Sequence, residues 1–156
     1  MSIENVKEYF KQFEIENKIL EFNQSSATVE LAAQALNVKP ERIAKTLSFK
    51  NEDSAILIVT AGDTKIDNKK FKSEFGFKAK MLTVEEVLQF TGHAIGGVCP
   101  FGLTNNLNIY LDESMKRFDK VYPACGSANS AIELTCDELE KYSNSVKWVD
   151  ICKDWE

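Results

Sequence analysis

Residues 43–61, IAKTLSFKNEDSAILIVTA, decide the fold. Residues 45–50 and 55–61 are each typical of an extended strand, and the second is an almost continuous apolar run. The polar residues between them, NEDS, are too few for a parallel crossover, which needs about a dozen residues or more. The pattern therefore predicts two strands that pair as an antiparallel hairpin.

Helices and further strands are predicted on both sides of this hairpin. Apolar residues at helical spacing predict a first helix over residues 3–13, and Pro40 begins a short helical turn. Side-chain caps, two of them capping boxes, predict four more helices, over residues 29–38, 68–75, 84–90 and 136–142. Short strands are predicted in residues 18–22, 107–111, 120–125 and 131–134. The last two form a second tight hairpin, so we expect an α+β fold with a mixed sheet.

Composition predicts one soluble domain over residues 1–156. The chain is 44% hydrophobic, enough for a real core, and has no apolar run of the ~20 residues that a membrane span needs. Its start, residues 1–10, does not resemble a signal peptide. The four cysteines are scattered and there is one histidine. We therefore expect no metal site, no disulfide framework and a reducing cytoplasmic location.

Charge is distributed unevenly along the chain. The formal net charge is −5, which argues against unspecific coating of nucleic acid. Six lysines between Lys65 and Lys80 nevertheless give that segment a balance of +4. The cluster is typical of a solvated helix surface, and it is also compatible with a docking face for a polyanion.

Lys45 shares one face of its predicted strand with Ile43, Leu47 and Phe49. A lysine among apolar side chains suggests a cavity that receives an anion or another electron-rich group. Alternatively, Lys45 lies at the start of the strand and extends its ammonium group into water.

Two loops are further candidates. Residues 94–103, AIGGVCPFGL, hold three glycines, whose backbone N–H groups could converge on a carbonyl oxygen; a tight structural turn is the alternative. Residues 125–130, CGSANS, could line a pocket rim or simply close a hairpin. Cys99 and His93 suggest a thiol nucleophile. The alternative is that Cys99 is a small buried side chain and that His93 lies on the surface.

Together these stretches resemble the YbaK and prolyl-tRNA synthetase-associated domains, which hydrolyse mischarged tRNA. The resemblance is carried by residues 25–50, 92–103 and 122–139. It implies a twisted, largely antiparallel, barrel-like sheet flanked by helices, no cofactor, aminoacyl-tRNA as partner, and an aminoacyl-tRNA synthetase as a candidate partner. Neither DNA nor a membrane is expected as a partner.

The resemblance also implies roles for individual residues. Lys45 would anchor the terminal nucleotide, and the loop containing Gly96, Gly97 and Pro100 would hold the aminoacyl carbonyl. The remaining pocket contacts are expected at Thr46, Val98, Cys99, Phe101, Gly126, Ser127 and Asn129. From the lysine cluster we expect RNA contacts by Lys69, Lys70 and Lys72. Two rival functions stay open: a non-catalytic module that binds an aminoacyl-like ligand, and a thiol hydrolase that uses Cys99.

Overall fold

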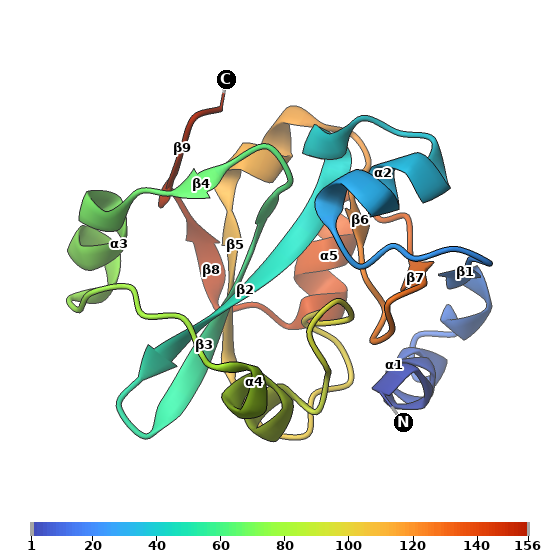
Figure 1. The fold of residues 1–156 in the computed structure, drawn as a ribbon, viewed down its shortest axis with the longest axis horizontal. Coiled ribbons are helices and arrows are strands. Elements are labelled where there is room, and N and C mark those ends of the chain that lie inside the picture. Colours follow the sequence, from blue (N-terminus) through green and yellow to red (C-terminus); the bar gives the residue numbers. More distant parts are fainter. Residues whose placement is uncertain (1, 156) are drawn as a thin grey trace.

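The computed structural model describes residues 2–155 and contains the predicted hairpin. Strand β2 (Ile43–Asn51) pairs antiparallel with β3 (Ser54–Ala61). The pair crosses the middle of the molecule (Figure 1). Both faces of β3 are buried, because Leu57 and Val59 face one apolar cluster while Ile56 and Ile58 face another. Burial on both sides explains the continuous apolar run in the sequence.

The hairpin is the centre of a five-stranded sheet with the order β6-β2-β3-β5-β8. Its other strands are β5 (Asn108–Asp112), β6 (Tyr122–Pro123) and β8 (Lys147–Val149). Two small antiparallel ladders flank it: β1 (Leu20–Glu21) with β7 (Ser130–Ala131), and β4 (Lys65–Ile66) with β9 (Cys152–Lys153). The sheet curls into half a barrel, and the α+β class is confirmed.

The balance of strand directions differs from the expected largely antiparallel sheet. Within the five-stranded sheet only β2 and β3 are antiparallel, while β6, β5 and β8 join their neighbours in parallel. The connection from β3 to β5 contains two helices and that from β5 to β8 contains one, which gives room for parallel crossovers. The second predicted hairpin is present as isolated antiparallel bridges, Val121 to Leu134 and Ala124 to Ala131.

The five predicted helices are confirmed. They are α1 (Ser2–Lys11), α2 (Val29–Leu36), α3 (Asn68–Phe75), α4 (Val84–Thr91) and α5 (Cys136–Ser143). Thr28, Asp67, Thr83 and Thr135 each accept backbone N–H groups at a helix start, and the two capping boxes form as predicted. Short 3-10 turns occupy Glu16–Lys18, Pro40–Arg42 and Glu113–Arg117.

The helices cover both faces of the sheet. Helices α1, α4 and α5 pack on the side of Leu57 and Val59, and α3 packs on the opposite side with the C-terminal segment. Helix α2 contributes Ala32 and Ala33 to a small cluster around Ile43. Within residues 2–155, no helix is long and apolar enough to cross a membrane.

Candidate functional site

A hollow lies where hydrogen bonding along the outer edge of β2 is interrupted. Strand β6 pairs with β2 only as far as Ala44. Residues 80–82 cover the edge again further on, where Leu82 N donates to Ser48 O at 3.3 Å. Because alternate residues of a strand direct their backbone groups to the same side, the N–H and C=O of Thr46 point into the gap, like those of Ser48.

The hollow at this gap has a volume of about 250 Å³. Its walls come from β2, from the segment before α2 and the start of that helix, from residues 81–87, from the glycine loop (residues 94–103) and from the β6–β7 region. The lining includes Ser26, Ala27, Thr28, Ala44, Lys45, Thr46, Ser48, Leu82, Val87, Ile95, Gly96, Val98, Tyr122, Ala124 and Ser130. The three stretches that drew attention in the sequence therefore meet around one cavity.

Two buried hydroxyl groups in this wall have no hydrogen-bond partner within the described residues 2–155. They are Thr46 Oγ1 and Ser26 Oγ. A buried hydroxyl without a partner typically costs about 1–3 kcal/mol, and a polar molecule in the hollow would remove that cost. The hollow is therefore suited to a ligand that carries hydrogen-bonding atoms as well as an apolar part.

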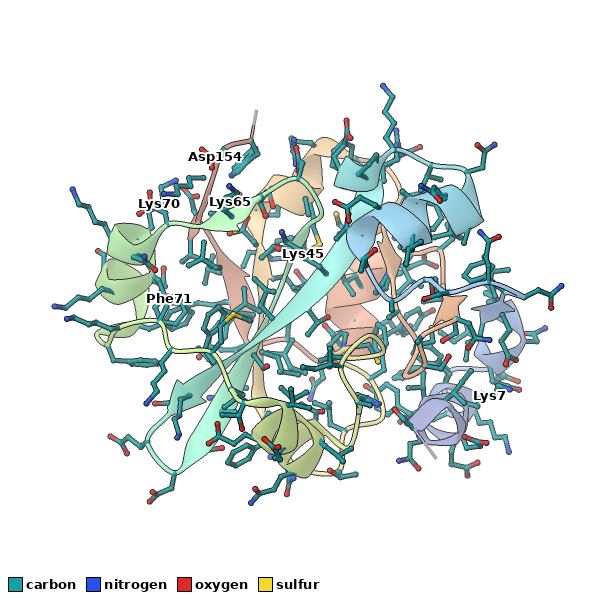
Figure 2. All side chains as sticks on the ribbon, in the orientation of Figure 1. Lys7, Lys45, Lys65, Lys70, Phe71 and Asp154 are labelled. Carbon is teal, nitrogen blue, oxygen red and sulfur yellow. The ribbon has the colours of Figure 1, made fainter. Side chains whose placement is uncertain are left out.

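Lys45 forms the cationic side of the hollow. The side chain is half-buried, and its Nζ donates to the carbonyl oxygen of Thr64 on the β3–β4 loop. Burial lowers the pKa of Lys45, with the negative charges of Asp63 and Glu30 acting in the opposite direction. In Figure 2 the side chain lies between β2 and Lys65. No carboxylate within residues 2–155 lies within 4 Å of this ammonium group, so its charge remains available to an anionic ligand.

The glycine loop is folded tightly against the 126–130 loop. Gly97 N donates to Ala94 O at 3.0 Å, so this N–H is used within the turn. A Cβ atom on Gly97 would lie 2.6 Å from Ser127 N. Gly97 is thus required for the contact between the two loops. Gly96, in contrast, lines the hollow and has a φ of +98°, a conformation that favours glycine.

The 126–130 loop positions one wall of the hollow. Ala128 O accepts from Ser26 N at 2.6 Å, and Asn129 Nδ2 donates to Phe22 O at 3.0 Å. Ser127 Oγ donates to Asn129 Oδ1 at 2.9 Å. The hydroxyls of these loop residues are therefore engaged with the protein, and the loop residue that faces the hollow is Ser130. Gly126, Ser127 and Asn129 lie behind the wall rather than in it.

Cys99, Pro100 and Phe101, in the second half of the glycine loop, are buried and do not line the hollow. Cys99 is fully buried, and burial raises the pKa of its thiol to about 12. Phe101 belongs to the core, where its ring lies 4.8 Å from that of Phe10. Within this loop Val98 borders the hollow, whereas the next three residues are all buried and show no regular alternation.

His93 is buried, so the expectation of a surface histidine is wrong. Its Nδ1 is hydrogen-bonded with Ser2 Oγ, and its Nε2 with Phe101 O at 2.7 Å. Burial lowers the pKa of His93. Although Cys99 Sγ lies 3.6 Å from His93 Nε2, the thiol is shielded from solvent and its ionisation is suppressed. The pair ties the glycine loop to α1 and is poorly suited to nucleophilic attack.

The lysines of α3 lie outside the hollow. Lys69, Lys70 and Lys72 are all exposed, and Lys70 forms an ion pair with Asp150 at 3.1 Å. Sequence reasoning did not identify Ser26 or Tyr122 as lining residues, whereas Ser130 belongs to the 125–130 loop that was considered as a pocket rim. Serine is common just before a helix cap. Ser26 differs from an ordinary turn residue only through its backbone contact with Ala128 in a distant loop.

Comparisons with known proteins agree on one family. Residues 23–142 match the sequence model of the aminoacyl-tRNA editing domain. An uncharacterised Bacillus subtilis protein, YwhH, is 59% identical over the full length of both chains. The Enterococcus faecalis protein EbsC, named as a candidate Cys-tRNA(Pro)/Cys-tRNA(Cys) deacylase, is 26% identical over 90% of this chain and 88% of its own.

Solved structures and larger enzymes extend the likeness. A crystal structure described as that of a candidate trans-editing enzyme for prolyl-tRNA synthetase superposes with a TM-score of 0.88, at 30% identity and 97% coverage of both chains. Part of the proline–tRNA ligase of Kosmotoga olearia is 31% identical over 65% of this chain, which corresponds to 18% of that enzyme.

Proposed function

Because the chain belongs to the aminoacyl-tRNA editing domain family, we propose that it removes the amino acid from mischarged tRNA by hydrolysing the ester bond to the terminal ribose. The substrate proposed first is tRNA(Pro) carrying a small amino acid, such as cysteine or alanine. A synthetase gains only ~1–3 kcal/mol from one methyl group, so a second, size-limited hydrolytic site improves accuracy. The observation that carries the proposal is the hollow itself, with one half-buried ammonium group and two unpartnered hydroxyls.

In the proposed reaction, water adds to the ester carbonyl carbon and the ribose oxygen leaves with a proton, giving free amino acid and tRNA. An aminoacyl ester is activated, so positioning and stabilisation of the oxyanion suffice. We assign Lys45 to the phosphate or hydroxyl groups of the terminal nucleotide. We assign the backbone N–H groups of Gly96 and Val98 to the oxyanion, because Gly97 N–H already has an acceptor in Ala94.

A panel of mischarged tRNAs tests the proposed function. The purified protein is incubated with tRNAs that carry alanine, cysteine, serine or threonine, and release of the amino acid is followed. We expect one or more of these esters to be hydrolysed much faster than without protein. Hydrolysis of none, combined with saturable binding of a non-hydrolysable aminoacyl-adenosine analogue, would instead favour the non-catalytic binding module.

Cys99→Ser separates the water mechanism from the thiol hydrolase. A serine hydroxyl can still donate to Phe101 O, the acceptor of the Cys99 thiol at 3.5 Å. We expect deacylation within about threefold of the unmodified protein, and no inactivation by iodoacetamide under native conditions, because the thiol is buried. Loss of activity in both experiments would support the thiol mechanism.

A further inference from the structure

Four lysines form a row that starts at the hollow and continues across the β4–β9 ladder. We call this the lysine row: Lys45, Lys65, Lys153 and Lys70. The ammonium group of Lys45 is bound to the carbonyl of Thr64, the residue directly before Lys65. Burial lowers the pKa of Lys45, and the positive charge of Lys65 acts in the same direction. Lys65 and Lys45 lie next to each other in Figure 2.

The β4–β9 ladder places the next two lysines side by side. Lys65 and Lys153 are direct register partners. The alternate positions, Ile66 and Cys152, pack into the core, so both lysines project outward from the same face. Cross-strand partners have Cβ atoms about 4.5–5.5 Å apart, and like charges at this separation destabilise a ladder.

Lys70 completes the row from helix α3. Its Nζ donates to Cys152 O at 3.1 Å, the carbonyl that directly precedes Lys153. Lys70 is also the member of the row that has a carboxylate partner, Asp150. No carboxylate in the described part of the chain lies within 4 Å of the other three ammonium groups.

Two acidic side chains beside the row have partners of their own, whereas Asp154, which follows Lys153 in the chain, forms no ion pair within the described residues. Asp67 accepts the backbone N–H groups of Lys69 and Lys70 as the cap of α3. Asp63 forms an ion pair with Arg117 at 2.6 Å. In a chain with a net charge of −5, three of the four ammonium groups, those of Lys45, Lys65 and Lys153, therefore have no carboxylate within 4 Å among the described residues. An external chain of regularly spaced negative charges would complement it.

We propose that the lysine row binds successive phosphates of the tRNA acceptor strand as its 3′ end enters the hollow. This inference rests on the proposed function, since it takes the hollow as the site of the terminal nucleotide. The main RNA contact then lies at the β4–β9 ladder rather than on the exposed face of α3. Strand β9, which lies beyond the residues 23–142 that match the family, then takes part in RNA binding through Lys153.

Binding of an unacylated tRNA(Pro) transcript tests the row without requiring hydrolysis. Fluorescence anisotropy gives the Kd at several KCl concentrations for the unmodified protein, for the double variant Lys65→Gln/Lys153→Gln and for Lys18→Gln. Lys18 is an exposed lysine two residues before β1, and β1 lies on the opposite side of the molecule from β4 in Figure 1. Far-UV circular dichroism and the thermal midpoint establish that each variant is folded.

Loss of two phosphate contacts should raise the Kd about tenfold or more near 0.1 M salt. It should also reduce the slope of log K against log salt by about 1.4–1.8, because each contact accounts for roughly 0.7–0.9. We expect Lys18→Gln to retain the original Kd and slope. A double variant that is folded and retains both would overturn the inference.

The outcomes separate this inference from the proposed function. If the unmodified protein hydrolyses no ester while the double variant binds tRNA more weakly than Lys18→Gln, the lysine row stands and the proposed function fails. If the unmodified protein hydrolyses a mischarged tRNA and the double variant has the same KM and salt dependence, the lysine row alone fails. Absence of tRNA binding by the unmodified protein would overturn the inference directly.

Discussion

Lys45 is the residue on which the proposed chemistry depends most. Replacing it with alanine removes the only ammonium group among the residues that line the hollow. We expect Lys45→Ala to lower kcat/KM for deacylation roughly hundredfold, a loss similar to that seen for a single positioned donor. Because Lys45 has no ion pair within residues 2–155, the free energy of unfolding should change by less than about 1 kcal/mol. Rates of amino acid release and urea denaturation measure the two effects.

Lys18→Ala is the matched control for this prediction. It removes the same charge from an exposed position. We expect both its kcat/KM and its stability to match those of the unmodified protein. Normal deacylation by Lys45→Ala on every susceptible mischarged tRNA would contradict the role assigned to Lys45.

His93 gives the protein a distinctive dependence of stability on pH. It is the only histidine of the chain, and burial lowers its pKa below the ordinary value of about 6.5. Between the folded pKa and 6.5 the unfolded state binds more protons than the folded state. The free energy of unfolding should therefore fall as the pH is lowered from 6.5 through the folded pKa of His93.

Urea denaturation between pH 5 and 7 measures this effect. Carboxylates titrate mostly below this range, so His93 should dominate the slope. We expect His93→Gln to be less stable at pH 7, because it disturbs the contacts with Ser2 and Phe101, and to show a flatter pH dependence. Equal slopes in the two proteins would show that His93 is not responsible.

Individual site residues could be predicted only in part. Strand alternation suggested a cavity at Lys45 as one of two alternatives. The structure places Lys45 and Gly96 at one hollow, together with Thr46 from the other face of β2. The sequence could not show that Cys99 and Phe101 lie inside the core, since loop residues lack a fixed period. The importance of Ser26 emerges only from its contact with Ala128, a hundred positions away.

The contact between the glycine loop and the 126–130 loop can be tested through Gly97. Alanine at this position brings a Cβ to within 2.6 Å of Ser127 N, and backbone on both sides must move. Overpacking of this kind typically costs about 1–3 kcal/mol. We expect Gly97→Ala to lower the free energy of unfolding by that amount and to weaken deacylation, because the wall that holds Ser26 shifts.

Gly76→Ala is the appropriate comparison. Gly76 ends α3 with a φ of +81°, and nothing lies within 4 Å of a Cβ placed there. Its substitution should cost about 1–2 kcal/mol through backbone strain alone. Deacylation should be retained, since Gly76 does not line the hollow. Activity that falls equally in both variants would indicate a general effect of lower stability rather than a displaced wall.

Helices were easier to predict than strands. Caps such as Thr83 with Glu86 are encoded within four residues, and these helix starts were located correctly. Strands β4, β8 and β9 were not predicted, because they contain two or three residues each and form through tertiary pairing. Ile151 N, for example, is fixed by the buried carboxylate of Asp112, at 2.9 Å.

For the whole molecule, we expect residues 1–156 to unfold as one cooperative unit. Both tryptophans, Trp148 and Trp155, belong to the C-terminal segment, whereas far-UV circular dichroism reports all helices and strands. Because β8 extends the central sheet and β9 pairs with β4, the two signals should change at the same urea concentration. A tryptophan transition at lower urea would identify the C-terminal segment as a separately unfolding part.

Local patterns predicted the central hairpin and the helices, and the resemblance implied the barrel-like curl of the sheet. The parallel crossovers were not foreseen, because local patterns do not specify which distant strands become neighbours. The site also depends on which distant segments become neighbours, because its walls join segments from five parts of the chain.

Because backbone pairing along the outer edge of β2 is interrupted at Thr46, a molecule in the hollow can supply the hydrogen bonds that a neighbouring strand would make there. A bound molecule that hydrogen-bonds to the Thr46 amide would bridge the pairing with β6 at Ala44 and the pairing with Leu82 at Ser48. Deuterium uptake at Thr46 should then slow on binding, and the protection should spread to both flanking segments. The ligand would leave a trace in backbone exchange even when no side chain changes its contacts.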